Sequence, residues 1–279
     1  MDAFKNKIIQ GNCLEVLKTI PSDFFDAGVT SPPYNKKEKN NGWLVKNVIY
    51  DKFQDKLPEE EYEKNQIEVL NEIFRTTKEG GHFFYNHKIR WENGTMFHPM
   101  SFLSKTNWSI RQEIIWDRSI AANIRGWRFW QIEERIYWLY KPKNGNKIGE
   151  ELKSKHALLT SIWRIRPENK VNHPAPFPIK LPLRCLISVL DGVENANILD
   201  PYAGSGSTLI AGKLLNANYT GIEISNSYIE VAEERLKQDF QLIFEEEMKL
   251  HKVEKTFKER KAEGKWNERN SENNKATLI

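Results

Sequence analysis

The sequence has few cysteines and no long apolar run. Its two cysteines, Cys13 and Cys185, lie far apart in the chain and form no Cys-x-x-Cys pair. A disulfide framework or a zinc knuckle needs more cysteines at short spacings, so neither is expected. The first residues are polar with no apolar segment behind them, and no stretch approaches the roughly 20 apolar residues of a membrane span. We therefore expect a cytoplasmic protein.

A large net charge and a metal-binding pattern are also lacking. The 42 Lys and Arg residues against 38 Asp and Glu give a net charge of +4, and 39% of the 279 residues are hydrophobic. These values are typical of a folded globular protein with one large domain or two small ones. His82 and His87 share no face of a regular element with a third ligand, so no metal is expected.

The charge is unevenly distributed along the chain. Residues 84–170 hold 16 Lys and Arg against 8 Asp and Glu, a local excess larger than that of the whole protein. Basic residues interleaved with aromatic ones suit a nucleic acid, because phosphates attract cations and unstacked bases stack on flat rings. For any single residue we favour the simpler interpretation of a core tryptophan or a solvated charge. Seven of the nine tryptophans lie in this stretch: Trp91, Trp108, Trp116, Trp127, Trp130, Trp138 and Trp163.

Short apolar runs alternate with amphipathic stretches, which predicts an α/β fold with helices on both faces of a sheet. The chain beyond residue 241 carries nearly balanced charges, which predicts a frayed, solvated helical extension and a loose tail. The predicted strands cover residues 7–11, 25–30, 82–86, 109–116, 135–140, 197–200 and 219–223. The predicted helices cover residues 13–20, 58–77, 183–191 and 207–215, with a last one after Ser225.

A glycine-containing turn, residues 200–206, connects a predicted strand to a predicted helix. Gly204 and Gly206 allow a close backbone approach to a ligand, and the helix N-terminus offers free N–H groups. Glu223 ends the next strand, where nucleotide-binding α/β folds place the acid that binds ribose hydroxyls. The third glycine of a dinucleotide fingerprint is absent, and Asp200 would repel a pyrophosphate. An acid there suits a cationic cofactor with an amino group, such as S-adenosylmethionine, better than a nicotinamide dinucleotide.

A second motif, Thr30-Ser31-Pro32-Pro33-Tyr34-Asn35, follows the predicted strand at 25–30. The two prolines remove two N–H donors and hold the backbone extended, so that carbonyl oxygens become fixed acceptors. With the Ser31 hydroxyl and the Tyr34 ring, such a loop can hold the exocyclic amine of a planar base. A third motif, His-Pro-Ala-Pro-Phe-Pro at 173–178, could form a rigid wall of the cofactor pocket. Alone, each motif could be a plain stiff turn.

With these three motifs in this order, the chain resembles the β class of prokaryotic DNA amino-methyltransferases, which methylate N4 of cytosine or N6 of adenine with S-adenosylmethionine. The resemblance extends from Ile8 to about Leu236. It implies a Rossmann-like methyltransferase fold with a mostly parallel seven-stranded sheet and a circularly permuted motif order. Residues 1–240 would form the methyltransferase domain and residues 241–279 the charged extension.

The resemblance also assigns residue roles. Ser31, Pro32, Pro33 and Tyr34 would form the catalytic loop that holds a flipped base. Asn12 stands where relatives commonly carry Asp near the cofactor adenine, and Glu223 would bind the ribose. The other cofactor-binding residues would be Asp200, Gly204 and Gly206 at the methionine part, Phe177 and Pro178 as the closing wall, and Tyr202 and Thr208 beside them.

The same likeness points to double-stranded DNA as the substrate. The family's recognition region usually follows the strand that matches residues 135–140, where only 141–161 is available here. We therefore expect recognition elements within 36–56 and 118–161. Phosphate contacts are expected from Lys36, Lys37, Arg118, Arg125 and Arg128.

Ser31 favours N4 of cytosine over N6 of adenine, since relatives that act on adenine more often have Asp or Asn there. Methylation of cytosine C5 needs a thiolate, and neither cysteine follows a proline in a catalytic loop. The family implies a paired restriction endonuclease of the same specificity and often a homodimer. Two alternatives stay open: an enzyme that methylates RNA or protein, and a non-catalytic DNA-binding protein with a vestigial cofactor pocket.

Overall fold

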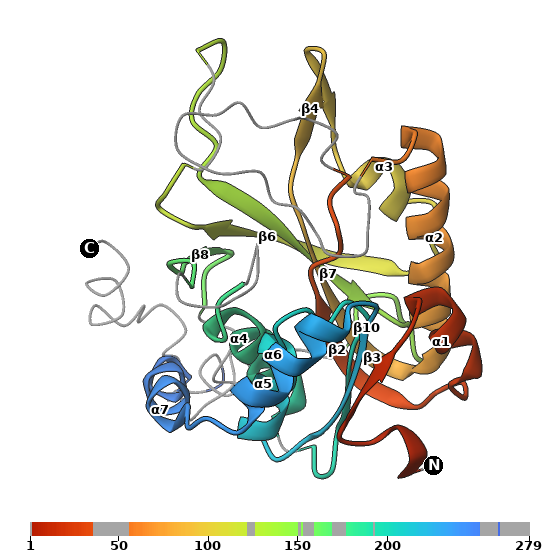
Figure 1. Cartoon of the computed structure of the whole chain (residues 1–279), viewed down its shortest axis with the longest axis vertical. Coiled ribbons are helices and arrows are strands. Elements are labelled where there is room, and N and C mark those ends of the chain that lie inside the picture. The colour runs from red at the N-terminus through yellow and green to blue at the C-terminus, as the bar shows by residue number, and fades with distance from the viewer. Residues whose placement is uncertain are drawn as a thin grey trace.

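The central feature of the computed structural model is an eight-stranded sheet in the order β1-β10-β9-β2-β3-β7-β6-β8, with helices on both faces (Figure 1). The structure describes residues 2–35, 56–121, 126–149, 152, 159–168, 177–191, 193–251 and 262. The strands are β1 (Lys7–Gln10), β2 (Phe25–Thr30), β3 (Thr77–His87), β4 (Arg90–Glu92), β5 (Thr95–Phe97), β6 (Ser109–Asp117), β7 (Glu133–Tyr140), β8 (Ile162–Arg164), β9 (Asn197–Asp200) and β10 (Asn218–Glu223). The α-helices are α1 (Cys13–Thr19), α2 (Glu59–Thr76), α3 (Met100–Leu103), α4 (Lys180–Leu190), α5 (Ser207–Leu214), α6 (Asn226–Leu236) and α7 (Gln241–Leu250). The predicted Rossmann-like α/β fold is confirmed.

The sheet is mostly parallel. Strands β1, β10, β9, β2 and β3 pair in parallel, β7 runs antiparallel to both of its neighbours, and β6 and β8 are parallel to each other. The sheet has one strand more than the seven that we predicted. The additional strand is β8, whose three residues are too short for a recognisable apolar pattern. Strands β4 and β5 form a separate two-stranded hairpin.

Side chains of the sheet alternate between two apolar cores. Ile198 packs with α4 and α5 on one face, and its neighbour Leu199 packs with α1 and α2 on the other. Four of the seven central tryptophans, Trp108, Trp116, Trp138 and Trp163, are buried in these cores, as the simpler interpretation held, whereas Trp127 and Trp130 are exposed. None of the helices that the structure describes has the length and apolarity of a membrane span.

The helix predicted after residue 241 is present as α7, but it packs on the core and is not the frayed, solvated extension that we expected. Ile243, Phe244 and Met248 pack against the core cluster that includes α4. Glu247 is buried and accepts two hydrogen bonds from Arg184, from Nε at 2.5 Å and from Nη2 at 3.1 Å. The apolar face was missed in the sequence because its residues are interrupted by charged ones. The residues from 252 onward, apart from 262, lie outside the described part of the chain.

The parallel strands bring the predicted motifs to one edge of the sheet. Thr30, Asp200 and Glu223 end β2, β9 and β10, which lie next to one another. Because the carboxyl ends of parallel strands point the same way, the loops that follow them meet at this edge.

Candidate active site

One buried hydrogen bond joins the first two motifs. Thr30 Oγ1 donates to Asp200 Oδ1 at 2.7 Å, and both residues are fully buried. Thr30 directly precedes the Ser-Pro-Pro-Tyr loop, and Asp200 opens the glycine-containing loop. Two segments 170 residues apart in sequence therefore start from one point.

One oxygen of the Asp200 carboxylate lacks a hydrogen-bond donor among the described residues. The Tyr202 backbone N–H also donates to Oδ1, at 3.1 Å, whereas Oδ2 is buried without a hydrogen-bond partner among the described residues. Burial raises the pKa of Asp200 to about 6, although the hydroxyl groups of Thr30 and Thr208 and the Tyr202 N–H favour its ionised form. A buried carboxylate oxygen without a donor is rare in folded proteins. It fits the ammonium group of S-adenosylmethionine.

The glycine-containing loop has a backbone that needs its glycines. Gly204 and Gly206 have φ angles of +48° and +80°, a left-handed region that other residues enter only with strain. A Cβ atom on Gly206 would also lie 3.0 Å from the Ala232 Cβ. The loop ends where α5 begins at Ser207, whose Oγ donates to the Phe177 carbonyl at 2.8 Å. Thus the end of the proline-rich motif is fastened to the predicted cofactor loop, while residues 173–176 lie outside the described ranges.

Arg235 supports the glycine-containing loop, a role that we did not predict from the sequence. It is buried, and its Nη1 donates to the Ser205 carbonyl at 2.7 Å and to Ser205 Oγ at 2.9 Å. Its Nη2 donates to Glu168 Oε2 at 2.8 Å. The sequence does contain a sign of this role. Arg235 follows Ala232 by three residues, so it lies on the apolar face of α6, where a cation needs a buried partner.

Glu223 and Asn12 lie close together at the ends of β10 and β1. Glu223 Oε2 accepts from the Gly204 N–H at 2.8 Å and Oε1 accepts from the Ser225 N–H at 2.9 Å, while burial raises the pKa of Glu223. Asn12 Oδ1 caps α1 by accepting from Leu14 N–H at 3.0 Å. Each Glu223 oxygen accepts one of these hydrogen bonds and keeps a second lone pair, whereas the Asn12 oxygen also accepts from the Glu15 N–H and is fully used in the cap.

Two other residues predicted to bind cofactor are placed in the interior. The Tyr202 side chain packs, with Cys13, against the core cluster under α1 and α2. Thr208 is fully buried, and its Oγ1 donates to the Val29 carbonyl at 3.1 Å. Both residues support the loop in this structure, and direct contact with a cofactor stays a prediction.

The Ser-Pro-Pro-Tyr loop ends in a polar network that the sequence did not reveal. The Tyr34 hydroxyl lies 2.6 Å from Ser31 Oγ and donates to Glu134 Oε2 at 3.0 Å. Asn86 Nδ2 lies within hydrogen-bond distance of all three partners, 3.2 Å from Ser31 Oγ, 2.6 Å from the Tyr34 hydroxyl and 3.0 Å from Glu134 Oε2. Arg118 Nη1 pairs with the other Glu134 oxygen at 3.1 Å. The network thus joins β2, β3, β7 and the residue after β6.

The hydroxyl groups of the network have defined donor and acceptor roles. Glu134, paired with the Arg118 guanidinium, is a carboxylate and can only accept, so the Tyr34 hydroxyl points its proton at Glu134. The Ser31 hydroxyl must then donate to the Tyr34 oxygen. Its own lone pairs are left to accept hydrogen bonds, from Asn86 and from a ligand.

The two proline carbonyls differ in their surroundings. The Pro33 carbonyl accepts a hydrogen bond from the Tyr62 hydroxyl at 2.9 Å. Within the described chain no hydrogen bond engages the Pro32 carbonyl, which leaves it available to a ligand. The Tyr34 ring is buried and packs against His87, with 4.7 Å between the ring centroids, so this face is closed to a base.

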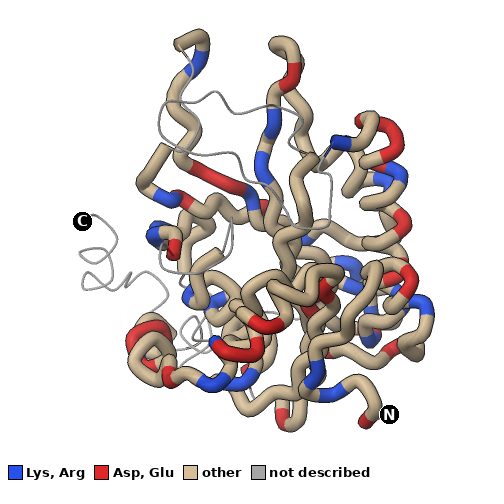
Figure 2. The backbone as a smooth tube through the Cα atoms, in the orientation of Figure 1, with Lys and Arg blue, Asp and Glu red and all other residues tan. Residues whose placement is uncertain are grey.

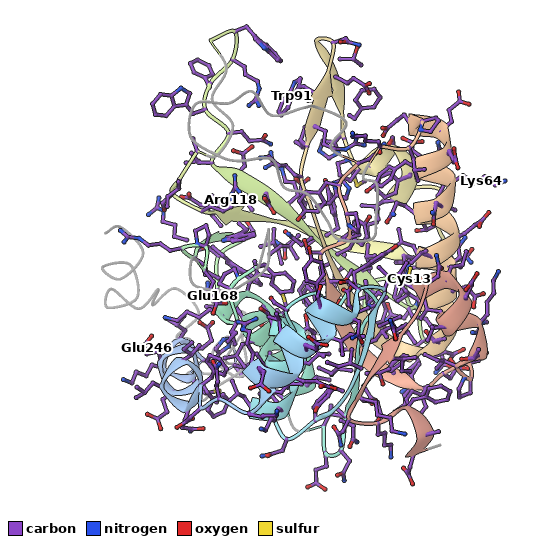
Figure 3. The ribbon with its side chains drawn as sticks, viewed as in Figure 1. Cys13, Lys64, Trp91, Arg118, Glu168 and Glu246 are labelled. Carbon is purple, nitrogen blue, oxygen red and sulfur yellow. The ribbon has the colours of Figure 1, made fainter. Side chains whose placement is uncertain are left out.

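The predicted phosphate contacts are placed differently from one another. The Arg118 side chain is only 11% exposed and belongs to the network with Glu134, rather than to an open surface (Figure 3). Arg128 lies on the connection between β6 and β7, with its guanidinium carbon 4.3 Å from the Trp91 ring centroid. Lys36, Lys37 and Arg125, together with much of the expected recognition segments, lie outside the described residues.

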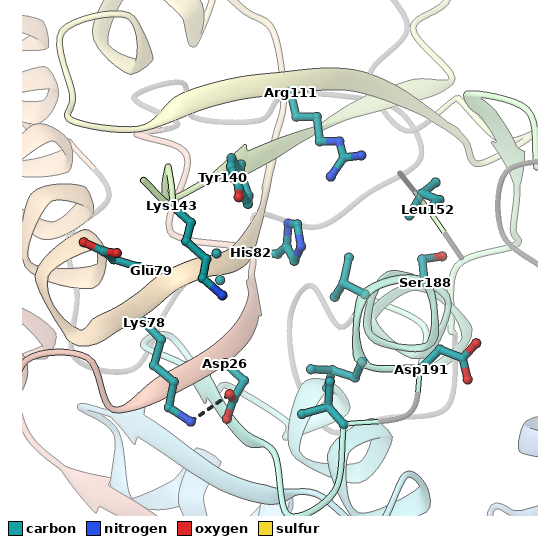
Figure 4. Close-up of a pocket in the computed structure, with 15 residues that line it drawn as sticks. Asp26, Lys78, Glu79, His82, Arg111, Tyr140, Lys143, Leu152, Ser188 and Asp191 are labelled. Carbon is teal, nitrogen blue, oxygen red and sulfur yellow. Dashed lines mark hydrogen bonds and ion pairs between the residues drawn. The ribbon is translucent and has the colours of Figure 1, made fainter. Parts of the chain in front are cut away.

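A cavity of about 270 Å³ opens at the opposite edge of the sheet, near the amino ends of the parallel strands (Figure 4). It is lined by Asp26, Lys78, His82 and Arg111 among others and by none of the predicted site residues. Burial and the nearby Arg111 charge lower the pKa of His82 to about 3, and Trp138 Nε1 donates to its Nδ1 at 3.1 Å. His82 is therefore a neutral wall residue. Within the described ranges, no group of His, Cys, Asp and Glu side chains could hold a metal ion.

Known proteins match this chain over most of its length. Residues 25–234 match the family model described as DNA methylase, N6_N4_Mtase. The type II methyltransferase M.HinfI from Haemophilus influenzae is 30% identical over 261 residues, which cover 84% of this chain and 69% of that protein.

Solved structures share the fold. The PvuII DNA methyltransferase (cytosine-N4-specific) matches with a TM-score of 0.66 at 15% identity, over 90% of this chain and 94% of that one. The M1.HpyAVI–SAM complex matches with a TM-score of 0.54 at 20% identity, over 82% of this chain and 98% of that one. Since the family model matches most of the chain, including the Ser-Pro-Pro-Tyr loop and the loop after Asp200, this chain belongs to the DNA methylase family of N6 and N4 amino-methyltransferases.

Proposed function

We propose that the protein transfers a methyl group from S-adenosylmethionine to the exocyclic N4 amine of a cytosine that is flipped out of duplex DNA. The observation that carries this proposal is the Thr30–Asp200 hydrogen bond. It places a carboxylate with a vacant acceptor beside a loop of hydroxyl and carbonyl acceptors. The first suits a cationic methyl donor and the second an amine that receives the methyl group.

The cofactor end of the site uses charge and backbone. Asp200 Oδ2 would accept the ammonium group of the methionine part, and Glu223 the ribose hydroxyls. The backbone of Gly204 and Gly206 would lie against the cofactor, with Phe177 and Pro178 as a wall. S-adenosylmethionine, when bound, supplies a methyl group activated by its sulfonium.

The base end of the site activates a poor nucleophile. The lone pair of the target amine is delocalised into the base ring, so nitrogen attacks slowly. Ser31 Oγ and the Pro32 carbonyl would accept hydrogen bonds from the two amine N–H groups, localise that lone pair and stabilise the positive charge that develops on nitrogen. Glu134 strengthens Ser31 as an acceptor, because each hydroxyl in the chain donates toward its carboxylate. No covalent enzyme intermediate is needed.

The same network gives the released proton a path. After methyl transfer, the amine nitrogen carries one proton too many. Its N–H bond breaks toward Ser31 Oγ, the Ser31 proton passes to the Tyr34 oxygen, and the Tyr34 proton passes to Glu134. The bond electrons remain on nitrogen, and the Glu134 carboxylate ends up protonated. The two protein steps span 2.6 Å and 3.0 Å.

The choice of N4 of cytosine rests on Ser31 at the first position of the loop, and N6 of adenine is the alternative. The type II name of M.HinfI supports a place in a restriction-modification system. A partner endonuclease of the same specificity, a homodimer and a cytoplasmic location remain predictions.

Incubation of the purified protein with S-adenosylmethionine and duplex DNA should produce N4-methylcytosine, measured by liquid chromatography and mass spectrometry of the nucleosides. N6-methyladenine alone would refute the base. Equal methylation of RNA would refute the substrate. Cofactor binding without any methylation of DNA would favour a non-catalytic DNA-binding protein.

Replacing Glu134 by Gln should lower kcat about 100-fold, because the hydroxyl chain then ends on a neutral group that cannot take a proton. Affinity for S-adenosylmethionine should stay unchanged, which shows that the variant is folded. Glu133→Gln is the matched control, since Glu133 is the adjacent residue of β7 and pairs with Arg135. A Glu134→Gln variant within twofold of the wild-type kcat would contradict the relay.

Affinity for S-adenosylmethionine should weaken about tenfold between pH 7.5 and pH 5, measured by calorimetry. The pKa of Asp200 is raised to about 6, so below that pH the carboxyl is protonated and no longer attracts an ammonium group. Asp200→Asn should bind weakly at pH 7.5 and lose most of this dependence, whereas Asp239→Asn, at an exposed acid, should behave as wild type. A wild-type affinity that does not change over this range would rule out the assigned role of Asp200.

A further inference from the structure

Large apolar side chains are exposed on the connection between β6 and β7. Trp127 is 60% exposed, Trp130 63% and Phe129 97%. On the β4–β5 hairpin, Met96 is 54% exposed. Folded proteins rarely leave such a group of apolar residues in water unless it binds something.

Both segments rise from the edge of the sheet that carries the site. Strand β3 ends at His87 just before the hairpin, β6 ends at Asp117, and β7 begins at Glu133 on the same edge. They form the two projections at the top of Figure 1. Phe129 precedes Glu134, the partner of the Tyr34 hydroxyl, by five residues, so the exposed tip is tethered close to the base loop.

Contacts between the projections hold the tip in place. The Arg128 guanidinium carbon lies 4.3 Å from the Trp91 ring centroid and 5.6 Å from that of Trp127. The Trp91 and Trp127 rings meet edge to face, with centroids 6.5 Å apart. Gln131 Nε2 donates to the Ile89 carbonyl at 3.2 Å, which fastens the connection to the chain before the hairpin. Phe129 is the most exposed of these rings, and the segment that carries it is held by these contacts.

We infer that Phe129 inserts into the DNA base stack at the position that the flipped base vacates, with Trp127 and Trp130 against the neighbouring nucleotides. This inference rests on the proposed function. Flipping leaves a gap between stacked bases, and side chains that kink DNA are typically apolar wedges. A flat ring in the gap restores stacking on both sides and slows the return of the base.

Charge favours DNA over a second copy of this chain as the partner. Arg128 lies on the projection between β6 and β7, and Figure 2 shows basic segments on both projections with a short acidic stretch near the hairpin tip. Arg90, on the hairpin, is only 11% exposed and pairs with Glu59, so it adds little to this charge. In a twofold contact between copies, the same patch faces itself, so Arg128 would approach its own equivalent. Phosphates beside an inserted ring would instead attract it.

The test compares methylation of two duplexes that carry the sequence modified by the wild-type protein, located by sequencing its products. In the first, the target base is paired. In the second, the base opposite the target is missing, so that flipping needs no unpairing. On the paired duplex, kcat/KM of Phe129→Ala should be about tenfold or more below that of the wild type. On the second duplex, the same variant should be within about threefold of the wild type.

Two control variants sharpen the comparison. Phe129→Trp keeps a flat ring and should stay close to wild type on both duplexes. Leu242→Ala removes a side chain that is 76% exposed on α7 and should change neither rate. Cofactor affinity should be equal in all variants.

An unchanged rate for Phe129→Ala on the paired duplex would overturn the inference, and so would an equal loss on both duplexes. A shift from dimer to monomer in light scattering that accompanies the loss would assign the patch to a contact between copies. If the wild-type protein methylates neither duplex, the proposed function itself fails.

Discussion

The hydrogen bond from Thr30 to Asp200 is the interaction on which the site depends. It ties the last residue of β2 to the last residue of β9, which are neighbours in the sheet, in a place that water does not reach. The loop after Thr30 carries the hydroxyl and carbonyl acceptors proposed to hold an amine, and the loop after Asp200 carries the glycines proposed to lie against the cofactor. Because both loops start from one rigid point, the donor and the acceptor of a methyl group can be held at a fixed distance, which is where much of an enzyme's rate acceleration arises.

Two buried carboxylates divide the chemistry between them. Asp200 has hydrogen bonds on one oxygen and none on the other, and its pKa is raised to about 6, so it gains most from a bound cation. Glu134 is held by Arg118 on one oxygen and by Tyr34 and Asn86 on the other. In the proposed mechanism the first acid would act on the cofactor, and the second would act on the base through two hydroxyl groups. The net charge of the chain, +4, gives no indication of these two buried carboxylates.

Contacts set by local sequence could be predicted, and contacts set by strand pairing could not. The bounds of the strands that end at Thr30 and Asp200 follow from their apolar runs, and so does the place of Glu223. Glu134 lies 100 residues from Tyr34, and it reaches Tyr34 only because β7 pairs antiparallel with β3, a register that no sequence pattern gives. The same holds for the ion pair of Arg118. The β4–β5 hairpin was missed although Asn93-Gly94 between its strands is a strong turn signal.

The proposed site at the ends of β2 and β9 would methylate a base amine in DNA. Sequencing DNA from cells that express the protein, with detection of modified bases, is the decisive experiment, because it reports the base, its sequence and the activity together. We expect N4-methylcytosine at one short fixed sequence, modified at nearly every occurrence, and none in cells without the protein. DNA that carries no modified base, or none at a fixed sequence, would contradict it.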